Sequence, residues 1–570
     1  MSSFHGDGSA TLGTDPAVGS VEDELEGAAV RRATRILPVA HRTVAVALTI
    51  GVVASLAAAC TNDDTFTAAG GLPTPSVQLD PTTVRDSGAT LDRIVEQTME
   101  ATGVPGVQVG VVHDGQVVFA KGYGVAEAGT DRPVTPETVF QIASVSKPIG
   151  ATAVAAVVGR GDIAWDQPVV TELPDFRLSS EYVTQNVTVA DLYSHRSGLP
   201  GDTAGNDLET IGFDQASIIP KLRELPLAPF RATYSYSNFG LTVGGLAAAA
   251  AYGAPFAQMA QEVLFGPAGM TSTSFSHDEF AQRTDTARLH VLRDGVFTTG
   301  FERNADAQAP AGGASSNVVD LNRWMLLQLA GGELDGQRIV DAEALAETKR
   351  SHINQDPAAE VDRPITGYGL GWNLNQSIVE PSLVEWSHSG AFTVGAGTAH
   401  SMFPELDLGV VVLTNAQPTG AAEAIIATYV DTLLHGEPSA DWTSLYGGSF
   451  SPLLSPPPLE RPAAPVPARD ASAYVGTYAN AYFGDVVVRT GAEGLEMAMG
   501  PGGATVFRLE PYDGDRFSFA DLPEIQGSTG LMSFTVPDGA ASSTSLVLAQ
   551  SLLFGPAGPE VTWTTIPRTG

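Results

Sequence analysis

Ser144 and Lys147 are spaced so that they can act together on a carbonyl compound. Residues three apart lie on one face of a helix, and an Ala-rich run that favours a helix follows this pair. A serine hydroxyl is a weak nucleophile until a neighbouring base accepts its proton, and a lysine fills that role where its surroundings lower its pKa. Pro148 is tolerated in the first turn of a helix that starts at Ser144. By itself the Ser-x-x-Lys pattern is also typical of an ordinary helix start.

Two further motifs follow in the chain. Residues 236–238 (Tyr-Ser-Asn) precede an Ala-rich helical stretch, and residues 388–391 (His-Ser-Gly-Ala) precede an alternating apolar strand. With residues 144–147 they resemble, in order, the three motifs of the serine β-lactamase and penicillin-binding protein-like superfamily, in its class C-like branch. That branch includes class C β-lactamases, D,D-carboxypeptidases, D-aminopeptidases and esterases.

Secondary signatures of the same superfamily strengthen the resemblance. Residues 192–200 resemble a conserved loop of the family, and residues 368–372 (Tyr-Gly-Leu-Gly-Trp) match another of its motifs. The small-residue run 311–316 matches a family turn at the rim of the site; it lacks the lysine and the spacing of a phosphate-binding loop. The resemblance extends from Leu91 to Gly436.

The resemblance implies a role for each motif residue. Ser144 attacks a carbonyl and becomes acylated, while Lys147 and Tyr236 exchange its proton and Tyr236 protonates the leaving group. Asn238 hydrogen-bonds Lys147 or a substrate amide. The backbone amides of Ser144 and Ala391, the latter following Gly390, form the oxyanion hole.

His388 departs from the commonest form of the family, which carries lysine at this position. We expect His388 to donate to Tyr236 or to a substrate carboxylate, with a charge that depends on pH near neutrality. This departure weakens the case for an efficient β-lactamase or a strict carboxypeptidase. Relatives with histidine here include D-aminopeptidases and esterases.

Three polar residues near the motifs have a simpler reading. His195 is expected to be structural, because polar loop groups commonly satisfy backbone atoms. Tyr234 is expected to pack beside the site, and Ser146 to point to another face of the helix.

Composition excludes several classes of function. The net charge of -34 argues against nucleic acid or an anionic membrane surface as a partner, since both require a basic surface. The acidity is typical of a soluble exported protein. The single cysteine permits neither a disulfide framework nor a cysteine-based zinc site, and the ten histidines show no metal-binding spacing. No metal or other cofactor is expected.

The N-terminal region predicts export. Residues 1–42 are polar and end in a basic cluster, and the apolar segment 43–60 reads as a signal or anchor. Cys60 lies where a bacterial lipoprotein carries its lipidated cysteine, and residues 56–60 form an imperfect lipobox. A plain signal peptide and an uncleaved anchor helix remain alternatives. The expected location is outside the cytoplasmic membrane, tethered to it by the lipid or helix.

The remaining chain predicts two folded domains. After a Thr/Pro/Gly-rich tether at 61–88, residues 89–446 are predicted to form a β-lactamase-like α+β fold, an antiparallel sheet packed with helices beside an all-helical region. Runs at 107–112 and 116–120 around Asp114-Gly115 predict a hairpin. A proline-dense linker covers 447–470, and 471–570 is predicted to be a small lipocalin-like β-barrel.

These features predict an exported serine hydrolase that acts through an acyl-enzyme on an ester or amide. A penicillin-binding sensor or scaffold that acylates without turnover is the alternative, because it would carry the same motifs. The motifs leave the substrate open among esters, D-amino-acid peptides and β-lactams, since specificity depends on pocket walls and loops. They also leave the oligomeric state open.

Overall fold

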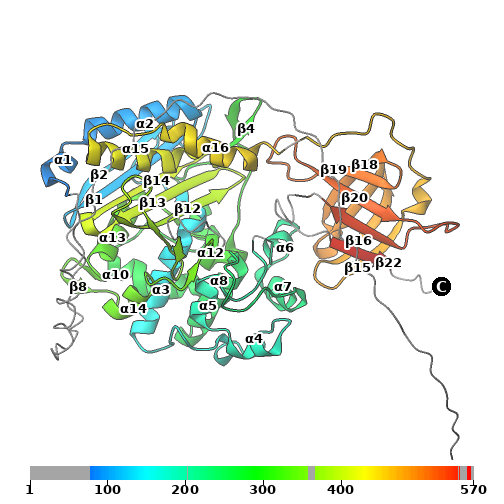
Figure 1. The fold of residues 1–570 in the computed structure, drawn as a ribbon, viewed down its shortest axis with the longest axis horizontal. Helices are drawn as coiled ribbons and strands as arrows, with labels where there is room; N and C mark the ends of the chain where they lie inside the picture. The colour runs from blue at the N-terminus through cyan, green and yellow to red at the C-terminus, as the bar shows by residue number, and fades with distance from the viewer. Residues whose placement is uncertain are drawn as a thin grey trace, which may run out of the picture. The chain divides into compact units, whose positions relative to one another are not determined.

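The computed structural model describes residues 78–201, 203–356, 366–456, 458–549, 551 and 561–565. These residues form two antiparallel sheets of eight strands, one open and packed with helices and one closed into a barrel (Figure 1). The predicted α+β architecture with an appended C-terminal β-barrel is confirmed. The predicted signal or anchor segment 43–60, with Cys60, lies outside the described residues.

The open sheet joins segments that are far apart in the sequence. Its strand order is β2-β1-β14-β13-β12-β11-β10-β9, and β1 (Gly106–His113) pairs antiparallel with β14 (Leu408–Thr414). The predicted β1–β2 hairpin is confirmed, and its turn residues Asp114 and Gly115 both have positive φ, 51° and 67°. Such a turn matches the twist of the two strands. The other strands are β2 (Gln116–Gly124), β9 (Ile353–Asn354), β10 (Gly367–Tyr368), β11 (Asn373–Gln376), β12 (Val384–Phe392) and β13 (Ala396–Phe403).

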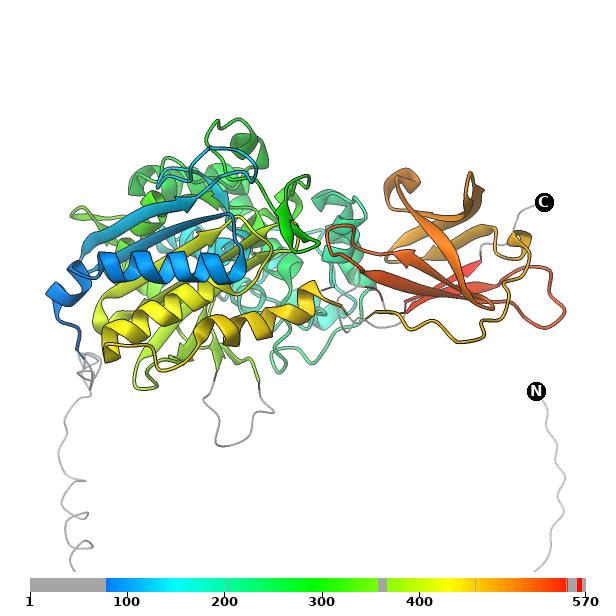
Figure 2. The ribbon, with the colours of Figure 1, turned by 90° about the horizontal axis from the view of Figure 1, so that it is seen from above.

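Helices cover both faces of this sheet. α2 (Gly88–Thr102) and α15 (Ala421–His435) contact each other and lie side by side on one face, as Figure 2 shows. α13 (Val318–Leu329) packs on the opposite face, where its apolar side chains join a separate core cluster. Because side chains alternate along each strand, one sheet serves two cores. Three further helices are α1 (Pro81–Arg85), α14 (Ala342–Glu347) and α16 (Trp442–Leu454).

Helices α1 and α16 lie partly or wholly in segments that the sequence assigns to connections between domains. α1 falls within the predicted tether. It forms because Asp80 accepts a hydrogen bond from Thr82 N at 2.8 Å and Pro81 suits the first helical position. α16 extends into the predicted linker, with Pro452 inside it. Helical structure therefore begins before residue 89 and continues beyond residue 446.

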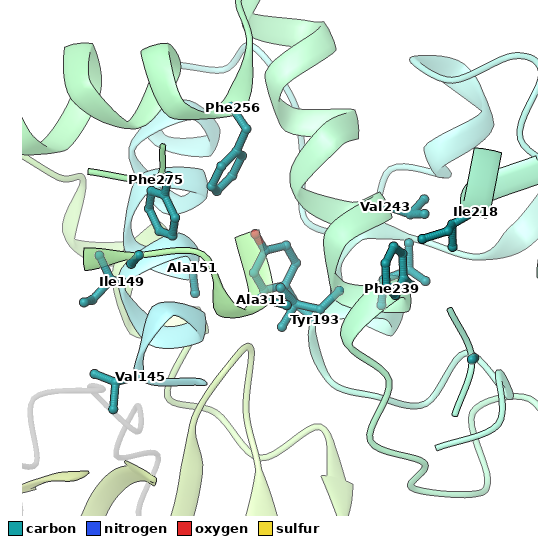
Figure 3. Close-up of a cluster of buried hydrophobic side chains, with 14 of the residues drawn as sticks. Val145, Ile149, Ala151, Tyr193, Ile218, Phe239, Val243, Phe256, Phe275 and Ala311 are labelled. Atoms are coloured by element: carbon teal, nitrogen blue, oxygen red, sulfur yellow. The ribbon is translucent and has the colours of Figure 1, made fainter. Parts of the chain in front are cut away.

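α3 (Ser146–Gly159) runs through the centre of the helical region. Its residues from Ser146 to Val157 are all buried, as expected for a helix that is apolar on every side. α8 (Asn238–Tyr252) packs against it, and Figure 3 shows Ile149 and Phe239 among the buried side chains of this core. The remaining helices are α4 (Glu181–Asn186), α5 (Val189–Tyr193), α6 (Asn206–Thr210), α7 (Gln215–Ile218), α9 (Phe256–Ala260), α10 (Gly266–Ala268), α11 (His277–Ala281) and α12 (Ala309–Gly312).

Within the described ranges no single helix is long and apolar enough to span a membrane. α8 together with the segment Phe256–Ala268 meets the length and composition criterion only as a pair bent by 72°. Three two-stranded sheets complete the α+β region: β3 (Phe140–Gln141) with β6 (Ser315–Ser316), β4 (Val291–Arg293) with β5 (Val296–Thr298), and β7 (Glu333–Leu334) with β8 (Gln337–Arg338).

The C-terminal barrel is filled by its own side chains. Trp563, Tyr474 and Met532 are fully buried, and the Phe534 ring centroid lies 4.8 Å from that of Tyr474. Eight strands enclose an interior just wide enough for side chains, and here aromatic rings occupy it. The strands are β15 (Gly476–Asn480), β16 (Gly484–Gly491), β17 (Gly494–Met499), β18 (Thr505–Asp513), β19 (Arg516–Ala520), β20 (Thr529–Thr535), β21 (Ser545–Ala549) and β22 (Val561–Thr565).

Candidate active site

Ser144 lies in a tight turn that leads from β3 into α3. Residues Ala143–Val145 form a 3₁₀ turn, and the α-helix begins at Ser146 rather than at Ser144 as expected. Ala143 has φ 47°, an uncommon conformation for a non-glycine residue. Thr398 of β13 holds the turn by donating to Ile142 O at 2.8 Å. Strained backbone of this kind clusters at active sites, where the surrounding structure maintains it.

The serine hydroxyl meets both predicted proton-transfer residues. Ser144 Oγ lies 2.9 Å from Lys147 Nζ and 2.9 Å from Tyr236 Oη. Lys147 is fully buried and also donates to Ala311 O at 2.9 Å, while its Nζ lies 4.6 Å from the centroid of the Tyr236 ring. The contact to Ala311 fixes the amine beside the hydroxyl. The arrangement can therefore move a proton between serine, lysine and tyrosine.

Strand β12 passes directly beside the turn that carries Ser144. A Cβ on Gly390 would collide with Ile142 O and Thr398 Oγ1, and would lie 3.1 Å from Ser144 N. Only glycine lets the strand approach this closely. The strand continues into Ala391, so the amides of Ser144 and Ala391 are held on neighbouring segments, as an oxyanion hole requires.

His388 takes part in a hydrogen-bonded chain with two other aromatic residues. Its Nδ1 lies 2.6 Å from Ser389 O, and its Nε2 lies 3.1 Å from the Tyr368 hydroxyl. That hydroxyl lies 3.2 Å from His195 Nε2, and His195 Nδ1 accepts from Ser237 N at 3.1 Å. The carbonyl of Ser389 can only accept, so His388 carries its proton on Nδ1. The amide N–H of Ser237 can only donate, so His195 carries its proton on Nε2. Tyr368 donates to His388 and accepts from His195.

Both histidines in this series of hydrogen bonds, His195 and His388, are neutral. Burial, and then the charge of Lys147, lower the pKa of His388 to about 3 and that of His195 well below its usual value. The expectation that His388 changes charge near neutral pH is therefore wrong, because the residue is removed from water. Its two ring nitrogens are engaged with Ser389 and Tyr368 rather than with Tyr236 or with a substrate. His388 supports the site as a fixed neutral group.

Asn238 is held by a residue that the motifs did not indicate. Its Nδ2 donates to Asn206 Oδ1 at 3.3 Å, and Asn206 Oδ1 also accepts from Gln308 Nε2 at 3.4 Å. Asn238 Oδ1 is buried and has no hydrogen-bond partner among the described residues. A buried carbonyl oxygen without a partner is costly unless a ligand supplies a donor. Asn238 is thus placed to accept from a substrate or from a group that moves during the reaction.

Other residues near the site had no sequence signal of their own. Glu209 of α6 accepts from Arg303 at 2.5 Å, and the Arg303 guanidinium lies 5.3 Å from the centroid of the Phe392 ring. These side chains come from segments far apart in the chain, so only the fold brings them together. Tyr368 lies in a recognised motif but was not predicted as a site residue. Tyr234 packs beside the site as expected, its ring centroid 5.4 Å from that of Tyr368.

The described residues offer no metal site. No group of three or more His, Cys, Asp or Glu side chains among them could hold an ion. A cavity of about 620 Å³ lies on the other face of β12, lined by Glu385, Ser387 and Ser389 among others. Because alternate residues of one strand face opposite sides, this cavity is separated by the sheet from His388 and Ser144. The candidate catalytic residues therefore lie on the opposite side of β12 from this cavity.

Known proteins resemble this chain in both sequence and fold. It matches the beta-lactamase family over residues 91–434, and residues 460–556 match a domain of unknown function (DUF3471). An unguisins hydrolase of Aspergillus campestris is 28% identical over 428 residues, which cover 70% of this chain and 77% of that protein. Esterase EstB of Burkholderia gladioli is 28% identical over 380 residues, or 60% of this chain and 95% of EstB.

A solved structure extends the likeness to the fold. The octameric penicillin-binding protein homologue from Pyrococcus abyssi aligns with a TM-score of 0.52 at 20% identity, covering 81% of this chain and 97% of the homologue. The family match spans more than half of the chain and agrees with the resemblance of the three motifs. This protein therefore belongs to the beta-lactamase family and is a serine hydrolase of that superfamily.

Proposed function

We propose that the protein is an exported hydrolase that cleaves an ester or amide through an acyl-enzyme on Ser144. The observation that carries this proposal is the placement of Lys147 Nζ and Tyr236 Oη, each 2.9 Å from Ser144 Oγ. A hydroxyl with two proton-transfer partners in reach meets the geometric requirement for an activated nucleophile.

The reaction follows from these contacts. Ser144 Oγ attacks the carbonyl carbon as its proton passes to Lys147 or Tyr236, and the amides of Ser144 and Ala391 stabilise the oxyanion. Tyr236 returns a proton to the leaving alkoxide or amine, which departs and leaves the acyl-serine. Water then attacks the acyl carbon, and its proton returns through the same groups to Ser144. The products are a carboxylic acid and an alcohol or amine.

The neutral His388 favours substrates that need no carboxylate anchor. A fixed cation at this position would pair with a carboxylate, whereas the buried neutral imidazole offers no charge. The name of one relative, Esterase EstB of Burkholderia gladioli, agrees with an ester as substrate. We therefore infer that simple esters, or amides without an essential carboxylate, react faster than penicillins.

Export and lipidation are proposed from the sequence alone. The segment 43–60 has the composition of a signal, and Cys60 follows small residues as a lipidated cysteine does. Cys60→Ser should release the protein from membranes into the soluble fraction. Unchanged membrane retention would reject lipidation and leave an anchor helix as the explanation.

One set of assays tests the proposed chemistry. The protein and its Ser144→Ala variant are compared on a p-nitrophenyl ester, a D-alanyl peptide, nitrocefin and a fluorescent penicillin. We expect ester or amide turnover by the wild type and none above background by the variant. Equal rates in both proteins would overturn the assignment. Stable penicillin labelling without turnover of any substrate would establish the sensor instead.

A further inference from the structure

Helix α6 connects the catalytic residues to the C-terminal barrel. On one side, Asn206 accepts from Asn238 Nδ2 at 3.3 Å, and Glu209 accepts from Arg303. On the other side, Asp207 is buried, with 3% of its surface exposed, and faces a residue of the barrel. Any shift of α6 therefore moves the partner of Asn238.

The barrel residue on Asp207 is Tyr482, in the turn between β15 and β16. Its hydroxyl donates to Asp207 Oδ1 at 2.7 Å and accepts from Gly205 N at 2.6 Å. Gly205 precedes α6 with φ 85°, and a Cβ there would collide with the Phe239 ring. The Tyr482 hydroxyl thus binds both Gly205, which precedes α6, and Asp207, the second residue of α6.

The turn that carries Tyr482 is itself fixed. Asn480 Oδ1 accepts from the backbone amides of Tyr482 and Phe483, each at 2.9 Å, and Asn480 Nδ2 donates to Thr562 O of β22 at 3.0 Å. Such a side-chain-to-backbone turn holds the loop in one conformation. The position of Tyr482 is therefore set by the barrel wall.

Further contacts hold the same region against the barrel. Lys221 donates to Tyr482 O at 2.8 Å, and Thr505 of β18 donates to Ile211 O, just after α6, at 3.0 Å. Burial raises the pKa of Asp207 to about 7, and its hydrogen bond from Tyr482 acts in the opposite direction. A buried carboxyl group depends strongly on such a partner. The Tyr482 hydroxyl is thus placed to fix the position of α6.

We propose that Tyr482 is a positioning residue for hydrolysis, acting through α6 and Asn206 on the amide of Asn238. Asn206 Oδ1 can only accept, so Asn238 must turn its N–H group towards it and present Oδ1 as an acceptor. The barrel, whose interior is filled, contributes to catalysis through this exterior turn. The inference rests on the proposed function, since it concerns the same site.

The test compares two tyrosine variants in the full-length chain. Tyr482→Phe removes only the hydroxyl that binds Asp207 and Gly205, whereas the control Tyr474→Phe removes a hydroxyl that donates to Asp515 at 2.7 Å within the barrel. On a p-nitrophenyl ester we expect Tyr482→Phe to lower kcat about ten-fold, because the variant loses both buried hydrogen bonds of the hydroxyl and α6 is held less firmly. KM should change less than kcat, and Tyr474→Phe should match the wild type. Equal kcat for all three proteins would overturn the inference.

A double-mutant cycle separates positioning from general damage. Asn206→Ala is made in the wild type and in Tyr482→Phe. If Tyr482 acts through Asn206, Asn206→Ala lowers kcat by a smaller factor in the Tyr482→Phe background than in the wild type. Additive losses in kcat would overturn the inference. The proposed function is tested separately, by an active wild type and an inactive Ser144→Ala variant. Failure of the inference about Tyr482 is therefore distinguishable from failure of the proposed function.

Discussion

The open sheet and the barrel each have eight antiparallel strands, but their side chains are used differently. The open sheet has helices on both faces, and a polar site forms where β12 meets the start of α3. The barrel turns one face inward and fills it with rings such as Trp563 and Tyr474. A sheet packed between layers can leave a polar site at a layer boundary, whereas a small closed sheet whose interior is filled has only its exterior available for interactions.

The largest expected effect is on the open-sheet site. Lys147→Met removes the amine beside Ser144 and should lower kcat/KM for ester hydrolysis at least about a thousand-fold. Lys349→Met is the matched control. Lys349 Nζ lies 5.1 Å from the ring centroids of Trp372 and Trp386, and burial lowers its pKa to about 7, yet it does not contact Ser144. If both variants lose activity equally, the rate depends on buried amines in general rather than on this site.

Gly390→Ala should have the next largest effect. The added Cβ would force β12 away from the turn that carries Ser144 and displace the Ala391 amide. A displacement of about 1 Å at reacting groups costs about a hundred-fold in kcat. Gly448→Ala in α16, where a Cβ meets nothing within 4 Å, should leave kcat unchanged. A fully active Gly390→Ala would show that the oxyanion amides lie elsewhere.

Acid should destabilise the open-sheet region through its buried histidines. Burial lowers the pKa of His195, His388 and His400, so below pH 6.5 the unfolded chain binds protons that the folded chain does not. Stability therefore falls as pH drops from 6.5 towards 3. All ten histidines of the chain precede residue 436, so the barrel lacks this contribution. Urea unfolding at pH 7 and pH 5 measures the loss.

His400→Phe sharpens this prediction. The centroid of the His400 ring lies 5.1 Å from that of Trp324 and 5.4 Å from that of Trp372, and neither of its nitrogens has a hydrogen-bond partner among the described residues. Replacing it by phenylalanine should reduce the loss of stability between pH 7 and pH 5. An unchanged pH dependence would assign the effect to other groups.

The smallest effect is expected in the barrel interior. Phe534→Leu leaves a small cavity beside the rings of Tyr474 and Phe517 and should lower stability by about 1–2 kcal/mol in urea unfolding. Because the rings that pack on Phe534 are those of Tyr474, Tyr478 and Phe517, and none belongs to the turn that carries Tyr482, kcat at 25 °C should stay at the wild-type value. A fall in kcat without unfolding would mean that the barrel interior, and not only its exterior turn, affects the site.

The structure brings Ser144, Lys147 and Tyr236 within hydrogen-bonding distance, and part of this proximity follows from local structure. Ser144 and Lys147 are one helical turn apart, and Tyr236 and Asn238 immediately precede or begin α8, so short spacing already limits their geometry. The β1–β2 hairpin was equally local. The charge of His388 was wrongly predicted, because a pKa depends on burial and on neighbours from other segments.

By itself the sequence indicated the family and an α+β fold with an appended β-barrel, and it predicted Ser144 as the nucleophile. Those features depend on residue types at short spacing and on alternating apolar patterns, which are readable along one chain. Only the tertiary structure decided that His388 is neutral, that Asn206 holds Asn238 and that Tyr482 reaches α6. Each of these joins residues distant in sequence, and only packing determines whether such atoms lie within hydrogen-bonding distance or are removed from water.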